Sequence, residues 1–134
     1  MSREAIAAFF RSKVIAVAGA SRDERKYGYR VYRRLKGSGR YTVYPVNPRT
    51  DEIDGDRCYP TLAALPERPD AVIFITPPPR TAALMREALG LGVRIFWMQP
   101  GADGPEAVRM AEEAGAHLVR GRCVLVTDPE EYLT

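Results

Sequence analysis

A run of five apolar residues that ends on a glycine, Val14–Ala18 followed by Gly19, constrains the fold of this chain more than any other feature. A strand without polar alternation is typical of a parallel sheet that is covered on both faces. After Gly19 come a turn of small residues and a basic loop, and we expect a helix to begin near Gly28. The pattern predicts the first strand–turn–helix unit of a nucleotide-binding sheet.

The turn after this strand is suited to a phosphate group. Gly19 can adopt a positive φ and lets a ligand approach the backbone, and the start of the next helix offers free N–H groups and the positive end of the helix dipole. The spacing differs from the dinucleotide fingerprint G-x-G-x-x-G, because Ser21 stands at its second glycine and the next glycine is Gly28. We therefore expect phosphate binding, but not ordinary NAD binding.

Length and composition are those of one globular domain. The chain has 134 residues, which is enough to bury a core, and 46% of them are hydrophobic. No segment approaches the ~20 apolar residues of a membrane helix, and residues 1–6 include an acidic residue and no long apolar stretch, unlike a signal peptide. We expect a single domain, residues 1–134, located in the cytoplasm and without a membrane partner.

Basic residues are concentrated in one part of the chain. The net charge is +3, yet residues 22–40 hold eight basic and two acidic side chains. Arg22, Arg25 and Lys26 lie beside the proposed phosphate turn, and we expect at least one of them to bind the ligand, whereas the later ones fit a solvated helix face equally well. Nucleic acid is not expected as a partner, because neither an aromatic platform nor a recognised DNA-reading motif accompanies these charges.

Strands and helices alternate along the chain. We expect strands at 14–18, 41–46, 71–76, 94–99 and 117–119, with a further extended piece at 123–126. We expect helices at 3–11, capped by Ser2, and at 28–36, 61–65, 80–89 and 105–114, with a brief helical turn after Asp128. This alternation predicts an α/β domain of three layers, in which helices cover both faces of a parallel sheet.

The ends of the first four strands point to a ligand. In a parallel α/β sheet, a ligand binds at the C-terminal ends of the strands, where the strand order reverses. These ends are small, polar or fixed by proline, and they lie at 19–21, 47–49, 76–78 and 99–101. Together they predict a slot with rigid walls.

The second strand end differs from that of an NAD site. Such a site uses a carboxylate for the ribose hydroxyls, but here Asn47 is followed by Pro48 and Arg49. Arg49 would favour a phosphate near the ribose, although the Asn47–Pro48 pair is also typical of a simple turn. The prolines at 77–79 leave a similar choice, because they either only stop the strand or provide a flat apolar wall for an adenine or pantetheine group.

Cysteine and histidine indicate no metal site. Cys58 and Cys123 do not form a C-x-x-C pair, and His117 is the only histidine. Two reduced thiols that behave as small buried hydrophobes are the default interpretation. Alternatively, the arginine that precedes each cysteine, Arg57 or Arg122, favours a reactive thiolate.

Several short segments, taken in their order and spacing, resemble a known family. They include Tyr-Pro-Val-Asn-Pro and Gly-Asp-Arg-Cys-Tyr-Pro, and they lie at 14–21, 27–28, 44–48, 55–60, 70–72, 92–93, 97–99 and 122–123. Spread over about residues 10–126, they resemble the small stand-alone CoA-binding proteins, whose Rossmann-like domain also stands at the N-terminus of the succinyl-CoA synthetase α subunit. The resemblance implies a five-stranded parallel sheet in the order 3-2-1-4-5, with coenzyme A in the cleft.

The resemblance also implies which residues bind each part of coenzyme A. Those that would line the pyrophosphate or close over it are Gly19, Ala20, Ser21, Lys26, Tyr27 and Gly28. Those that would hold the adenosine and its 3′-phosphate are Val46, Asn47, Pro48 and Arg49. Those that would contact the nucleotide or pantetheine are Thr76, Pro77 and Pro78, and those near the thiol are Gln99 and Gly101.

Ligase chemistry does not follow from the resemblance. The synthetase α subunit carries its phosphorylated histidine in a second domain, and His117 does not match that position. Without a paired acid and base, the sequence favours a non-catalytic module that binds coenzyme A or an acyl-CoA, as a carrier, sensor or partner subunit. The alternative is an NAD(P)-binding or thiol-redox protein that acts through Cys58 or Cys123.

Overall fold

The chain folds into three layers around a parallel sheet. The computed structural model describes residues 3–133, so Ser2, the expected cap of the first helix, lies outside the described residues. The five strands of the sheet are β1 (Val14–Ala18), β2 (Thr42–Val46), β5 (Ala71–Phe74), β6 (Ile95–Met98) and β7 (His117–Val119). All neighbouring strands pair in parallel.

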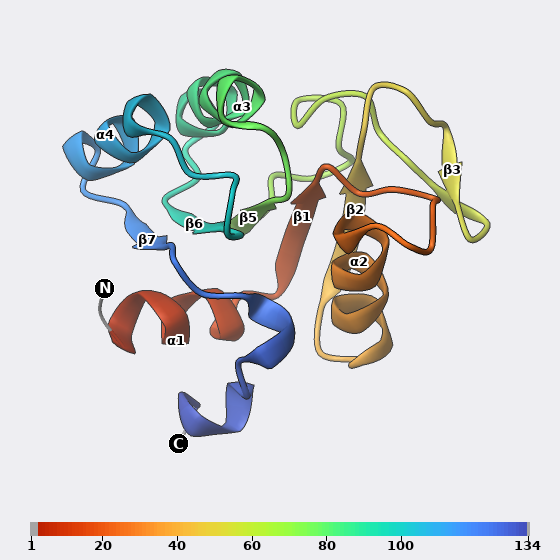
Figure 1. Cartoon of the computed structure of the whole chain (residues 1–134), viewed down its shortest axis with the longest axis horizontal. Coiled ribbons are helices and arrows are strands. Elements are labelled where there is room, and N and C mark those ends of the chain that lie inside the picture. Colours follow the sequence, from red (N-terminus) through yellow and green to blue (C-terminus); the bar gives the residue numbers. More distant parts are fainter. Residues whose placement is uncertain (1–2, 134) are drawn as a thin grey trace.

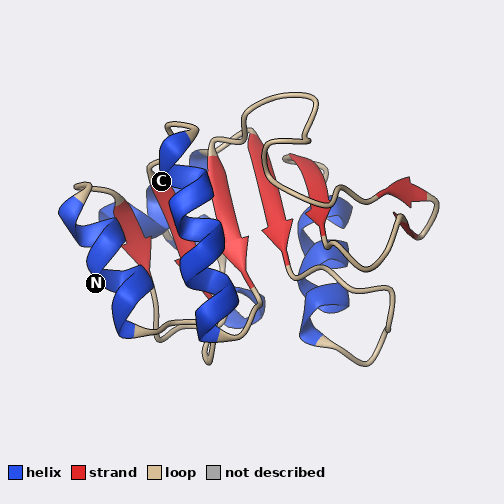
Figure 2. Ribbon diagram, turned by 90° about the horizontal axis from the view of Figure 1, so that it is seen from above, coloured by secondary structure: helices blue, strands red, loops and turns tan. Residues whose placement is uncertain are grey.

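Helices cover both faces of the sheet, as Figure 2 shows. The helices α1 (Arg3–Arg11) and α2 (Tyr27–Gly37) pack on one face, and α3 (Pro78–Gly90) and α4 (Pro105–Glu113) pack on the other (Figure 1). The position of β1 between the two layers of helices explains why its sequence is apolar throughout. Its odd-numbered core residues, 15 and 17, pack with α1 and α2, whereas 16 and 18 pack with α3 and α4, because successive side chains of a strand point to opposite faces.

The α/β class and the five-stranded parallel sheet are confirmed, and the position of one strand requires a correction. The order is β2-β1-β5-β6-β7, so the strand expected at 71–76 lies beside β1 rather than outside β2. The place outside β2 belongs to the segment at Tyr59, which forms an isolated parallel bridge with Val46. Every residue of β5 is buried, which suits the middle of a sheet and not its edge.

Two expected elements have a different form. Residues 61–65 form turns and no helix, because five residues between Pro60 and Pro66 are too few to propagate one. The piece at 123–126 is not extended, since Val124–Val126 is a short 3₁₀ helix. Side chains of β6 and of the residue after it hold this segment: Trp97 Nε1 donates to the carbonyl of Arg122 at 2.9 Å, and the N–H of Val124 donates to Gln99 Oε1 at 2.8 Å. The expected last turn is the 3₁₀ helix Pro129–Glu131.

The polar loop after β2 contains a small hairpin that the sequence did not predict. Its strands, β3 (Glu52–Ile53) and β4 (Asp56–Arg57), pair antiparallel, and Ile53 is fully buried in the core beside α2. Figure 1 shows the hairpin next to α2 and far from α4. Over residues 3–133, none of the helices combines the length and apolar character that crossing a membrane requires.

Candidate functional site

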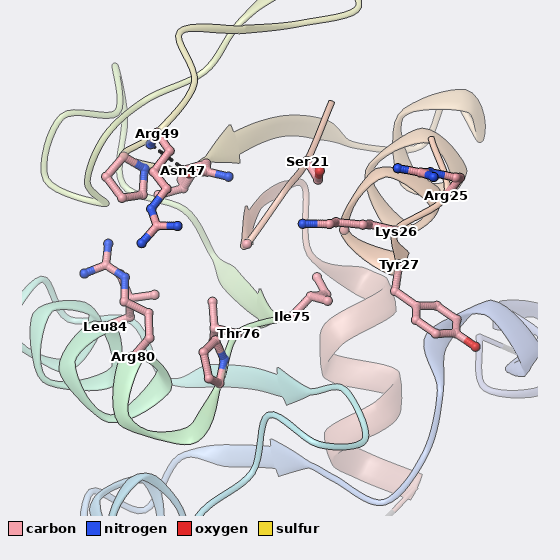
Figure 3. A pocket seen from close by; sticks show the side chains of 15 residues that line it. Ser21, Arg25, Lys26, Tyr27, Asn47, Arg49, Ile75, Thr76, Arg80 and Leu84 are labelled. Carbon is pink, nitrogen blue, oxygen red and sulfur yellow. Dashed lines mark hydrogen bonds between the residues drawn. The ribbon is translucent and has the colours of Figure 1, made fainter. Parts of the chain in front are cut away.

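A cavity of about 720 Å³ opens at the C-terminal ends of β1, β2 and β5 (Figure 3). The chain leaves β1 for β2 on one side and later returns to β5 on the other, so the cavity lies where the strand order reverses, the usual ligand position in such sheets. The lining residues are Gly19, Ser21, Arg25, Lys26, Tyr27, Gly28, Val46, Asn47, Pro48, Arg49, Ile75, Thr76, Pro77, Arg80 and Leu84.

Two glycines bring the first turn of α2 against the end of β1. Gly19 has a φ of +92°, and a Cβ there would lie 2.2 Å from the carbonyl oxygen of Ile75. A Cβ on Gly28 would lie 2.1 Å from the carbonyl oxygen of Gly19. Gly28 therefore permits the close helix–strand packing that the third glycine of the dinucleotide fingerprint provides, although a longer loop separates it from β1.

The start of α2 faces the same turn. Its N-cap residue, Lys26, has an extended backbone and makes no side-chain capping hydrogen bond. The first residues of the helix, Tyr27 and Gly28, line the cavity. The partial positive charge of a helix N-terminus is thus directed at the cavity without an acidic side chain in the first turn to offset it.

Asn47 joins two of the strand ends to each other. Its Nδ2 donates to the carbonyl of Ala20 at 2.8 Å, and its Oδ1 accepts from the N–H of Arg49 at 2.8 Å. The amide therefore closes an Asx turn and ties the end of β2 to the turn after β1. Asn47 thus forms the expected turn and also lines the cavity.

Three cations that line the cavity have no acidic partner. Lys26, Arg49 and Arg80 form no ion pair with any residue in the described range 3–133. In Figure 3 the guanidinium groups of Arg49 and Arg80 point toward one another, and the ammonium group of Lys26 projects into the cavity between the strand ends. Among the described residues no carboxylate lines the cavity. The arrangement favours an anionic ligand.

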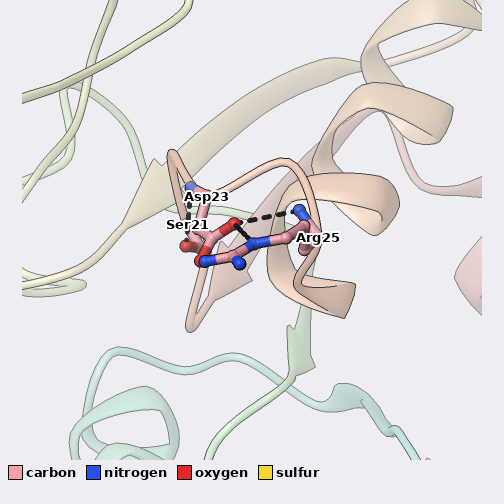
Figure 4. A network of polar contacts seen from close by, with 3 residues as sticks. All are labelled: Ser21, Asp23 and Arg25. Atoms are coloured by element: carbon pink, nitrogen blue, oxygen red, sulfur yellow. Dashed lines mark hydrogen bonds and ion pairs between the residues drawn. The ribbon is translucent and has the colours of Figure 1, made fainter.

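A fourth cation, Arg25, is paired within the loop that precedes α2 (Figure 4). Its Nε and Nη2 each donate to one carboxylate oxygen of Asp23 at 3.1 Å. The hydrogen bond from Arg25 lowers the pKa of the Asp23 carboxyl to about 2. This loop also contains Ser21, whose Oγ accepts from the N–H of Asp23 at 3.0 Å.

The other wall of the cavity is mostly apolar and comes from the end of β5 and from α3. Ile75, Pro77 and Leu84 line it, and the Thr76 hydroxyl is hydrogen-bonded to that of Thr81 at 2.6 Å. Sequence reasoning missed Arg80, Ile75 and Leu84 as site residues. A signal was present, since Arg80 and Leu84 are four residues apart and so share one face of the helix after a strand end.

Five of the expected site residues do not line the cavity. Ala20 is fully buried, and Gln99 is turned inward, where its Nε2 contacts Cys123 Sγ at 3.3 Å. Arg22 is exposed, and its Nη1 donates to Thr50 Oγ1 at 3.4 Å. The two remaining residues are Pro78, which lines a small groove between α3 and α4, and the exposed Gly101.

Neither cysteine lines the cavity, although Cys58 Sγ donates to the carbonyl of Asn47 at 3.8 Å. Burial raises the pKa of the Cys58 thiol, so the expectation that Arg57 favours its thiolate is wrong, and the Arg57 guanidinium instead lies over the Tyr59 ring. Both thiols are free. Residues 3–133 contain no cluster of histidine, cysteine and carboxylate groups that could hold a metal ion.

Comparison with known proteins places most of the chain in one family. The family described as CoA binding domain matches residues 13–129. The alpha subunit of an ADP-forming acetate–CoA ligase II from Pyrococcus furiosus is 31% identical over 126 residues, which are 87% of this chain and 28% of that subunit. The chain thus spans a minor part of the curated ligases that it matches.

Shorter proteins of known structure match over nearly their full length. A conserved hypothetical protein from Pyrococcus furiosus is 38% identical, with a TM-score of 0.79 over 85% of this chain and 97% of that one. A protein from Thermus thermophilus is 31% identical, with a TM-score of 0.84 over 100% of both chains.

Proposed function

Because the chain belongs to the CoA-binding domain family, we propose that it binds coenzyme A or an acyl-CoA in the cavity at the ends of β1, β2 and β5. The observation that carries this proposal is the convergence of three unpaired cations, Lys26, Arg49 and Arg80, on one cavity. Coenzyme A carries two anionic groups, a pyrophosphate and a 3′-phosphate. Unpaired like charges stay close together at a cost in stability, which an anionic ligand offsets.

The proposed pose follows from the position of each cation. The pyrophosphate lies against Gly19, Ser21 and the start of α2, where backbone N–H groups and Lys26 neutralise it. The 3′-phosphate lies between Arg49 and Arg80. The apolar wall then packs against the adenine or the pantetheine arm, and the thiol end passes Thr76 toward the end of β6, where Gln99 and Gly101 lie outside the cavity.

We further propose that the module is not catalytic. Apart from the phenol of Tyr27, the ionisable groups that line the cavity are all basic, among the residues that the structure describes. Acyl transfer needs a nucleophile or a general base, and neither cysteine lines the cavity. The ligase activity of the longer relatives therefore does not carry over, and a carrier, sensor or partner role fits better than the thiol-redox alternative.

Calorimetric titration tests the proposal. CoA, dephospho-CoA, NAD⁺ and NADP⁺ are titrated into the protein in parallel. We expect CoA to bind with a Kd in the micromolar range, about −8 kcal/mol, to weaken as salt is added, and to bind more tightly than the two dinucleotides. Absence of CoA binding at millimolar ligand would refute the proposal, and binding of NADP⁺ alone would assign Arg49 to a 2′-phosphate instead.

A further inference from the structure

The loop between β1 and α2 contains an ion pair at the mouth of the cavity (Figure 4). Arg25 lines the cavity, yet its guanidinium is directed at both carboxylate oxygens of Asp23. Lys26, the next residue, lines the same cavity and has no acidic partner within residues 3–133. Two neighbouring cations therefore differ in their availability to a ligand, and Asp23 causes the difference.

The backbone holds the Asp23 carboxylate in place independently of the ion pair. The N–H of Arg25 donates to Asp23 Oδ1 at 3.0 Å, and the N–H of Asp23 donates to Ser21 Oγ at 3.0 Å. These contacts form a tight turn of the kind that aspartate and serine favour. The carboxylate therefore stays beside Ser21 even when the guanidinium moves away.

The guanidinium of Arg25, in contrast, is free to move. Its side chain is 90% exposed in the ion pair, against 32% for Asp23. An exposed pair of this kind contributes little to stability, because water screens both charges. A phosphate group offers arginine a stronger, charge-assisted and bidentate contact, so exchange of one anion for the other is favourable.

We propose that Asp23 is an internal competitor for the phosphate groups of the ligand, and that Arg25 leaves Asp23 and pairs with a phosphate when an anionic ligand enters the cavity. The proposal rests on the proposed function, because it concerns the same site. Asp23 would lower the affinity for anions, whereas the cations that line the cavity would raise it. Before a ligand binds, Lys26, Arg49 and Arg80 are available to it, and Arg25 becomes available when it leaves Asp23. The Asp23 carboxylate stays in place and disfavours anions that bind weakly.

The test compares two substitutions that remove the same charge from neighbouring residues. Asp23→Asn keeps an oxygen for the N–H of Arg25 and so preserves the turn. Glu24→Gln is the matched control, because Glu24 forms no ion pair with the residues that the structure describes. Each variant and the parent are titrated at low ionic strength with inorganic pyrophosphate and, separately, with CoA.

Asp23→Asn should bind pyrophosphate and CoA about twofold to fivefold more tightly than the parent, which corresponds to removal of one exposed ion pair. Glu24→Gln should give a smaller gain, and the gain from Asp23→Asn should disappear when Arg25→Gln is added. Equal gains from Asp23→Asn and Glu24→Gln, weaker binding by Asp23→Asn, or no pyrophosphate binding by any variant would overturn the competitor role. If pyrophosphate behaves as expected and CoA does not bind, the exchange at Arg25 stands and the proposed function fails.

Discussion

The cations around the cavity and those along α2 have the same chemistry but different partners. Around the cavity, Lys26, Arg49 and Arg80 come from three separate segments and lack ion pairs within the described residues. Along α2, two of the four cations form ion pairs with carboxylates. Lys36 forms an ion pair with Asp56, and Arg33 Nε lies 3.5 Å from Asp54 Oδ2.

The partners along α2 come from the β3–β4 hairpin. Tyr29 Oη donates to Asp54 at 2.8 Å, and Tyr32 Oη donates to Asp56 at 2.6 Å. Four side chains on one face of the helix thus contact two carboxylates of the hairpin. The hairpin has few residues, and these contacts, together with buried Ile53, hold it against α2.

The comparison shows that a count of basic residues does not locate a site. The sequence places eight basic residues at 22–40, yet most of them stabilise the fold through paired contacts on α2 or nearby. Three of the cations without an ion pair among the described residues line the cavity where the strand order reverses, and two of these three lie outside that basic stretch. The availability of the cations, rather than their number, distinguishes the cavity from the contact between α2 and the β3–β4 hairpin.

The largest effect is expected from closing the cavity at its glycine contact. In Gly28→Val the new side chain would meet the carbonyl oxygen of Gly19, since even a Cβ would lie 2.1 Å from it. We expect CoA binding to fall below detection and the free energy of unfolding to fall by about 1–3 kcal/mol, as measured by calorimetry and urea denaturation. Gly37→Ala in the same helix is the control, because a Cβ there meets nothing within 4 Å. Parent-like CoA binding by Gly28→Val would refute the packing argument.

A smaller and more selective effect is expected from a free cation. Arg49→Ala should weaken CoA binding about tenfold, the value of one charged hydrogen bond, and should weaken dephospho-CoA binding much less, because the proposed contact is to the 3′-phosphate. Arg33→Ala removes a paired cation from α2 and should leave both affinities unchanged. Titration of both variants with both ligands decides the point. Equal losses for CoA and dephospho-CoA in Arg49→Ala would remove the 3′-phosphate from this position.

Much of the fold could be predicted because burial leaves a clear pattern in the sequence. The strands that are covered on both faces are apolar throughout, and proline or glycine marks their ends. Strand neighbours are harder to predict, because nothing in the periodicity of 71–76 distinguishes a place beside β1 from a place outside β2. The β3–β4 hairpin was missed because each of its strands has two residues, too few to show alternation.

The candidate site could be predicted where it follows the backbone and not where it depends on side-chain direction. Gly19, Asn47 and Thr76 were found because strand ends meet at one edge of a parallel sheet. Arg80 was missed because it reaches the cavity from a helix. Gln99 has the position of a ligand-binding amide, yet its side chain holds residues 123 and 124 in place, which only the tertiary structure reveals.

The smallest effect is expected at the contact between α2 and the β3–β4 hairpin. There, Asp56→Asn should alter the free energy of unfolding and leave CoA binding unchanged. The ion pair with Lys36 and the hydrogen bond from Tyr32 hold the pKa of Asp56 below its ordinary value of 3.8. A lowered folded-state pKa adds stability above the unfolded-state pKa, and this stability is lost as the pH falls through the folded-state value. The parent should therefore exceed Asp56→Asn by about 1 kcal/mol at pH 7, and the two should converge between about pH 5 and pH 2. Urea denaturation across this range measures the difference. A difference in the free energy of unfolding that stays constant at all pH values, or a changed CoA affinity at pH 7, would contradict this prediction. Either result would mean that the contact between α2 and the hairpin is not separate from the cavity.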